Sequence, residues 1–136
     1  MSARLPDWED RLAAYLAGVR ERPHAFGAHD CALHGAAAVE AVTGVDHGAP
    51  FRGRYTTERG AALALRRHGA GTIEATFDRH LASVPVALAR RGDLVMSDGS
   101  IGVCIGGEAM LVGRDRETDG LVRVARRDWS KAWAVG

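Results

Sequence analysis

Apolar residues in the first half of the chain recur every three or four positions, a spacing that predicts amphipathic helices. The first predicted helix follows Asp7, which with Asp10 would form a loose capping box, and it cannot continue past Pro23. The second follows Asp30, a residue type favoured at helix N-caps, and ends at Thr43-Gly44. Two shorter helices are predicted at residues 57–68 and about 73–81.

The pattern changes from helical to alternating in the second half of the chain, after a break at Pro85. Short apolar stretches separated by Gly, Ser and Asp predict an antiparallel meander. Its strands are predicted at residues 94–96, 101–105, 109–112, 121–124 and 133–135. Helices first and strands second predict an α+β fold, in which the helix at Cys31 packs on a sheet built from residues after Gly92.

The length of 136 residues is sufficient for one hydrophobic core without stapling by disulfides. We therefore expect one domain over residues 1–136. Its expected parts are an N-terminal helix in 1–23, a helical half in 24–85 and the sheet in 92–136.

Charge and cysteine content narrow the classes of function. The net charge is +1, from 18 basic and 17 acidic residues, and the paired arginines lack interleaved aromatic residues, so nucleic-acid binding is not supported. Cys31 and Cys104 have neither metal-site spacing nor the pattern of a disulfide framework, and no cofactor is indicated. No apolar segment approaches the length of a membrane span, and residues 1–22 lack the apolar core of a signal peptide. We therefore expect a protein that is made in a bacterial cytoplasm.

Cys31 is the strongest candidate for chemistry. It follows Asp30 and would lie in the first turn of its helix, where free amides and the helix dipole favour a thiolate. That is a common setting for a nucleophile. The alternative is that Cys31 is a small apolar residue of the core.

Histidines near Cys31 are weaker candidates. His29 and His34 could act as bases for the thiol, although His34 would lie one helical turn beneath it. His24, His47, His68 and His80 flank the predicted elements, and we expect them in solvent. A metal site built from His24, His29 or His34 lacks a standard ligand spacing.

Three motifs in this order resemble the NlpC-type cell-wall endopeptidases of the papain-like superfamily. Gly27-Ala28-His29-Asp30-Cys31 carries that family's Gly-x-Asp-Cys motif with one extra residue. Gly92-Asp93-Leu94-Val95 matches the Gly-Asp-Leu-Val that opens its sheet, and residues 100–106 match the next strand. The resemblance implies a papain-like fold and cleavage of peptidoglycan stem peptides by a Cys-His pair with a third polar residue.

A narrower resemblance is to short proteins of phages and phage-like particles. These share the Asp-Cys motif together with Thr43-Gly44-Val45-Asp46, Arg52-Gly53-Arg54-Tyr55 and the terminal Ala132-Trp133-Ala134-Val135-Gly136. In phages, NlpC-like domains accompany tail-tip proteins. This resemblance implies a place in the virion tail and partners among tail-tip or hub proteins, with peptidoglycan as a further candidate partner.

The resemblance fails at the catalytic histidine. Ser100 stands at that position, and the third polar residue falls at Val112. Serine cannot act as a general base at neutral pH, and valine cannot orient one.

Alternation along the strand places Ser100, Gly102 and Cys104 on one face, which we expect to be the face toward the helices. Gly102 would then allow close approach of the Cys31 helix, and Cys104 would belong to the core rather than form a redox pair with Cys31.

Three functions remain open. The first is a degenerate NlpC-like domain with a structural or assembly role in a phage tail tip or baseplate. The second is an active peptidoglycan cysteine endopeptidase with a non-standard base. The third is a small bacterial interaction module unrelated to phage. Ser100 and Val112 favour the first over the second.

The C-terminal segment is the candidate docking surface. Trp129 and Trp133 lie four residues apart, beside Arg126-Arg127, and tryptophan is enriched at interface hot spots. Exposed indoles there would bind a tail-tip or baseplate protein. The alternative is that both indoles seal the domain's own sheet.

Overall fold

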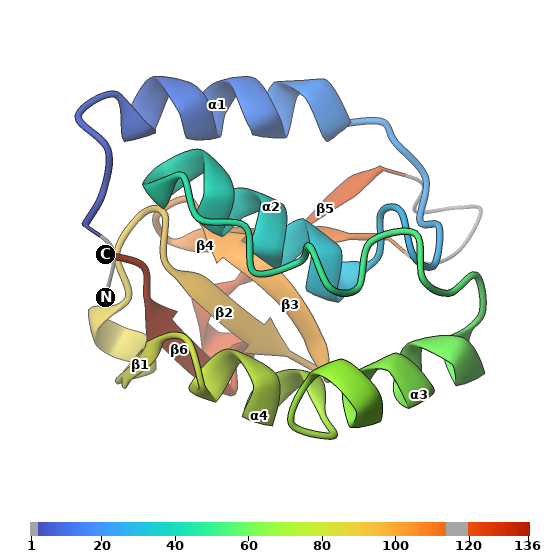
Figure 1. Cartoon of the computed structure of the whole chain (residues 1–136). Coiled ribbons are helices and arrows are strands. Elements are labelled where there is room, and N and C mark those ends of the chain that lie inside the picture. The colour runs from blue at the N-terminus through green and yellow to red at the C-terminus, as the bar shows by residue number, and fades with distance from the viewer. Residues whose placement is uncertain (1–2, 114–119) are drawn as a thin grey trace.

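A computed structural model describes residues 3–113 and 120–136, and within them it shows four α-helices layered on a six-stranded antiparallel sheet (Figure 1). Helix α2 packs on the sheet and α1 packs on α2, so α1 is the outermost layer. The α-helices are α1 (Trp8–Val19), α2 (Cys31–Thr43), α3 (Glu58–His68) and α4 (Ile73–Asp78). The predicted α+β class is confirmed.

The sheet has the strand order β1-β6-β2-β3-β4-β5. Its strands are β1 (Ala82–Val84), β2 (Leu94–Ser97), β3 (Ser100–Cys104), β4 (Glu108–Val112), β5 (Leu121–Ala125) and β6 (Lys131–Ala134). Short 3-10 turns lie at Val86–Leu88 and Arg126–Asp128. The prediction that the sheet begins after Gly92 is wrong, because β1 precedes it and pairs with β6. β1 has three residues and ends beside Pro85, which hid the strand in the sequence.

Capping residues explain where the helices begin. Asp30, Thr57 and Thr72 each accept a hydrogen bond from a backbone N–H in the first turn of α2, α3 and α4, respectively. Asp7 precedes α1 as predicted, but its side chain makes no capping hydrogen bond, so the expected capping box is absent. Gly44 ends α2 in the left-handed conformation that glycine adopts readily.

The two faces of the sheet carry separate apolar clusters. The face toward α2 presents Leu94, Met96, Ile101 and Val103, which pack with α2 and with Trp133. The other face packs around Trp129. Its buried members are Ala89, Val95, Cys104, Ala109, Leu111, Trp129 and Ala132.

This division corrects the expected orientation of β3. Cys104 is fully buried on the Trp129 face, so the prediction that it faces the helices is wrong. Close approach of α2 to the sheet depends on Gly35 of the helix, where a Cβ would lie 2.6 Å from Cγ2 of Ile101. A Cβ at Gly102 would instead meet Leu111.

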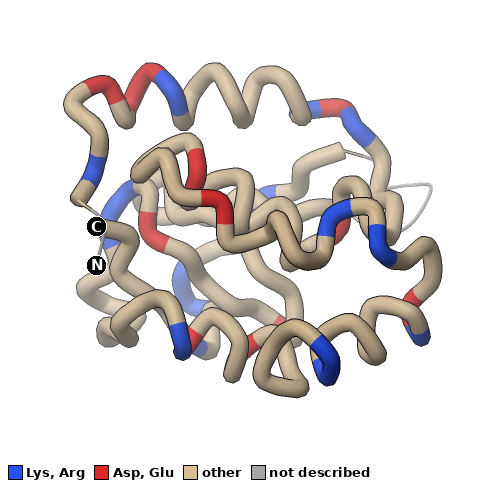
Figure 2. Tube along the Cα trace, viewed as in Figure 1, with Lys and Arg blue, Asp and Glu red and all other residues tan. Residues whose placement is uncertain are grey.

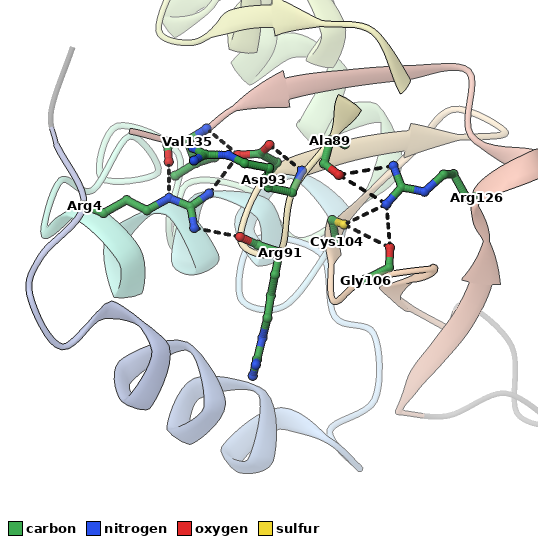
Figure 3. Close-up of polar contacts among 9 residues, drawn as sticks. Arg4, Ala89, Arg91, Asp93, Cys104, Gly106, Arg126 and Val135 are labelled. Atoms are coloured by element: carbon green, nitrogen blue, oxygen red, sulfur yellow. Dashed lines mark hydrogen bonds and ion pairs between the residues drawn. The ribbon is translucent and has the colours of Figure 1, made fainter. Parts of the chain in front are cut away.

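The motif that opens the sheet has a structural role. Asp93 is buried, and its carboxylate accepts hydrogen bonds from the Arg4 guanidinium (3.0 Å), the N–H of Val135 (3.0 Å) and the N–H of Arg90 (2.8 Å) (Figure 3). Arg4 also donates to the carbonyls of Val135 and Arg91. One carboxylate therefore joins the first described residues, the start of β2 and the end of the chain.

The C-terminal segment is part of the core. Trp133 is fully buried on the α2 face and Trp129 is 6% exposed on the opposite face, so the prediction of exposed indoles is wrong. The Arg126 guanidinium lies over the Trp129 ring at 4.6 Å and donates to the carbonyl of Val86. It also donates to the carbonyls of Ala89 and Gly106 (Figure 3). Only Arg127 of the four expected docking residues is exposed. The two rings therefore seal opposite faces of the sheet, Trp133 from β6 and Trp129 from the turn that precedes β6.

In the part of the chain that the structure describes, no helix combines the length and apolar character needed to cross a membrane.

Candidate functional site

Cys31 is the first residue of α2, as predicted, and its side chain is half-buried. Asp30 precedes it and accepts hydrogen bonds from the backbone N–H groups of Leu33 (2.9 Å) and Gly27 (3.0 Å). The hydroxyl of Tyr55 donates to the same carboxylate at 2.5 Å. The predicted cap is confirmed, and it also ties the turn before Cys31 to the segment before α3.

Tyr55 belongs to the Arg52-Gly53-Arg54-Tyr55 motif, whose backbone packs against the turn before Cys31. The N–H of Gly53 donates to the carbonyl of Gly27 at 2.8 Å. Gly27 has φ +81°, and a Cβ there would lie 1.8 Å from the carbonyl oxygen of Tyr55. Burial, followed by the hydrogen bond to Asp30, raises the pKa of Tyr55, so the phenol stays protonated and donates.

A cavity of about 280 Å³ opens beside Cys31 between α2, α3 and α4. Each helix contributes side chains from one face. The lining residues from these helices are Cys31, Ala32, Leu33 and Ala36 of α2, Glu58, Ala61, Ala62 and Leu65 of α3, and Ile73, Thr76 and Phe77 of α4. The walls are therefore mainly apolar, and Figure 1 shows α3 and α4 running below α2.

Histidines that we expected in solvent line this cavity. His24 and His47 are half-buried there, whereas His80 contributes to the wall but is exposed, as expected. The rings of His47 and His80 stack with centroids 4.2 Å apart. Burial, followed by the neighbouring His80, lowers the pKa of His47, which favours the neutral imidazole. His68 is exposed, as expected.

The two histidines closest to Cys31 in sequence lie outside the cavity lining. His34 is fully buried, and its Nε2 lies 2.9 Å from the carbonyl oxygen of Met110, to which it must donate. Its Nδ1 therefore accepts the hydrogen bond from the Tyr15 hydroxyl at 2.7 Å. Burial lowers the pKa of His34 to about 4. Both nitrogens are engaged between α1, α2 and β4, an arrangement that stabilises the fold rather than serves the thiol.

His29 packs edge-on against His34, with ring centroids 5.9 Å apart. Among the described residues, its buried Nε2 finds no hydrogen-bond partner. Burial lowers the pKa of His29 as well. His29 and His34 thus form a buried pair outside the cavity lining.

The residues that replace the family's base and third polar group do not converge on Cys31. Ser100 pairs with Ser97, whose hydroxyl donates to the carbonyl of Asp128 beside Trp129. Paired residues of adjacent strands share a face, so Ser100 lies on the face away from α2. Val112 is buried and pairs with Leu121.

The charges of the cavity limit its ligands. Among the described lining residues, Asp30 and Glu58 are acidic, and neither Lys nor Arg is present. Figure 2 shows few charged positions along α2, where Glu40 is the one Asp, Glu, Lys or Arg. The described residues also include no group of three or more His, Cys, Asp and Glu that could hold a metal ion. The site therefore offers a thiol, mainly apolar walls and two carboxylates, without a cationic side chain from Lys or Arg among the described lining residues.

Sequence reasoning missed the cavity itself. Its signals were present as apolar residues at helical spacing, Ala61 with Leu65 and Ile73 with Phe77, which we assigned to helix packing. Only the placement of α3 and α4 opposite α2 turns these faces into walls.

Comparison with known proteins gives one result. A family model described as a domain of unknown function, DUF6950, matches residues 3–135, nearly the whole chain. No curated protein matches the chain.

Proposed function

We propose that this chain, which belongs to the DUF6950 family, is a degenerate NlpC-like domain with a structural role in the tail tip or baseplate of a phage or phage-like particle. Its partners would be other tail-tip or hub proteins, and its location the virion tail. The observation that carries the proposal is Ser100, which replaces the expected histidine and faces away from α2.

The structural roles of the motif residues support this proposal. Asp93 fastens both ends of the described chain, and Tyr55 fastens the turn before Cys31. Thr43 and Gly44 end α2, while Asp46 pairs with Arg52 at 2.7 Å in the connection that follows. These contacts give the motif residues structural roles that do not require a catalytic base.

An active cysteine endopeptidase is the second candidate. One observation favours it: Cys31 lines the same cavity as His24, His47 and His80. One of these imidazoles would then have to take the place of the missing base.

Incubation with purified cell walls separates the two candidates. We expect no soluble muropeptides from the wild-type protein under conditions in which an active NlpC-type endopeptidase releases them. If the wild-type protein releases muropeptides and Cys31→Ala does not, the proposal of a degenerate domain is refuted and the protein is an active cysteine endopeptidase.

The tail role is tested separately in particles. We expect an epitope-tagged chain, expressed during particle production, to sediment with purified tails in a density gradient. Of the four residues expected at the docking surface, Arg127 is the exposed one. Arg127→Ala therefore tests that surface in the same assay. A tagged chain absent from tails that carry all other components would refute the proposed location.

A further inference from the structure

We infer that the cavity between α2, α3 and α4 is a binding site for an uncharged aliphatic acyl group, whose polar end lies at Cys31. The inference goes beyond the proposed tail role and does not depend on it. Its basis is the lining, size and charge of the cavity.

The lining of the cavity extends over more than one turn of α2. It follows the helix from Cys31 to Ala36, a rise of about 7.5 Å at 1.5 Å per residue. The stacked rings of His47 and His80 lie in its wall and also border a second cavity beside Val39, further along α2. A linear group fits this outline, with its head at the thiol and its tail toward the histidine pair.

The size of the cavity fits a medium-length chain. Its volume is about 280 Å³. At roughly 30 Å³ for each heavy atom, similar to a water molecule in the liquid, this space holds about nine atoms. An acyl group of about eight carbons matches that number.

Small side chains keep the space open. Ala32 and Ala36 on α2 and Ala61 on α3 belong to the lining, where larger apolar side chains would reduce the volume. Small-molecule sites are concave and mainly apolar with a few polar groups, and this cavity, which opens to solvent, has those features.

Charge selects for a neutral ligand. The carboxylates of Glu58 and of Asp30, which precedes Cys31, belong to the described lining, and no Lys or Arg among those residues could pair with an anion. A free fatty acid would place its carboxylate near these groups. An ester, amide or thioester of the same chain carries no such charge.

Cys31 itself can report occupancy of the cavity. We expect N-hexylmaleimide to modify Cys31 more than about tenfold faster than N-ethylmaleimide, because each added methylene leaves water on binding. Rates are normalised to those of a free cysteine and read at Cys31 by peptide mass spectrometry, with buried Cys104 as the internal reference.

Two variants on α3 localise the effect. Ala61→Phe adds bulk to the cavity wall and should bring the rate ratio close to one. Leu63→Phe adds bulk on the same helix at a residue that is 43% exposed and outside the lining, and it should leave the ratio unchanged. A wild-type ratio near one, or the same ratio in both variants, overturns the inference.

A measurement without thiol chemistry covers the case in which Cys31 reacts with neither reagent. We expect octanamide to raise the melting temperature of the wild-type protein and of Leu63→Phe, but not of Ala61→Phe. Octanoate, which has the same chain and a negative charge, should raise it less. No shift with octanamide up to its solubility limit, or an equal shift with octanoate, refutes the proposed ligand class.

Discussion

The carboxylate of Asp30 joins three segments at the residue scale. It caps α2 through Leu33, closes the preceding turn through Gly27 and receives the hydroxyl of Tyr55 from the segment before α3. The first contact was predictable from local sequence, since Asp is a favoured N-cap. The contact with Tyr55 spans 25 positions and required the fold. The position of Cys31 therefore depends on a residue that sequence motifs alone left unconnected to it.

Removal of the Tyr55 hydroxyl tests this role. We expect Tyr55→Phe to lower the free energy of unfolding by about 2 kcal/mol, because hydrogen bonds to charged groups contribute about 1.5–3 kcal/mol. Arg54→Ala, an exposed neighbour, should change it by less than about 0.5 kcal/mol. Urea denaturation of the three proteins gives the measurement. Equal stability of Tyr55→Phe and Arg54→Ala would contradict the role assigned to the hydroxyl.

At the scale of elements, the turn before α2 and the segment before α3 are in contact through their backbones. We predict that Gly27→Ala is strongly destabilising, by at least about 2 kcal/mol more than Gly53→Ala, because the added Cβ would overlap a backbone carbonyl. Both glycines have positive φ, +81° and +75°. At Gly53, however, an added Cβ would meet no other atom within 4 Å. The comparison therefore separates backbone strain from close approach.

Thermal and urea unfolding of both variants provide the test of that contact. The Gly53→Ala variant should lose only about 1–2 kcal/mol, the cost of a left-handed conformation for an alanine. If the two variants lose the same stability, the close approach of Tyr55 to Gly27 is not a constraint on the fold.

The sequence predicted the elements better than their orientation. Helix starts were found because Asp30 and Thr57 act on their own first turns, and the strands after Gly92 were found from alternation. Alternation also grouped Ser100 with Cys104 correctly, but it cannot say which face of a strand meets the helices. Ile101 faces α2 because Gly35 of α2 approaches it, a contact between distant parts of the chain.

The candidate site was predictable only in part for the same reason. Cys31 and its cap follow from local rules, whereas the cavity depends on how α3 and α4 are placed against α2. His47 and His80 come together from separate connections, and no local pattern links them. The sequence left open whether Trp129 and Trp133 are exposed or seal the sheet, because their burial depends on both faces of the finished sheet.

At the scale of the whole molecule, a buried polar cluster joins the helical layers to the sheet. His34 of α2 links Tyr15 of α1 to the backbone of Met110 in β4, and His29 packs against its ring. The hydrogen bonds require a neutral imidazole, since Nδ1 accepts while Nε2 donates. Protonation of His34 would remove the acceptor and place a charge in the core, so the stability of the whole fold is coupled to its titration.

This coupling predicts a loss of stability in mild acid. The pKa of His34 is about 4 in the folded protein, against 6.5 for an ordinary histidine, so between these values the unfolded chain binds more protons. The contribution of His34 is fully present above pH 6.5 and declines as the pH falls toward 4. At about pH 5 the loss should be about 2 kcal/mol, from about 1.4 kcal/mol per pH unit.

Urea denaturation between pH 7.5 and 4 measures this loss in the wild-type protein and in His34→Gln, which cannot titrate. The variant's curve should be flatter, with a residual slope from His29, whose pKa is also lowered. Parallel curves for the two proteins would show that His34 is not the group that couples the fold to pH.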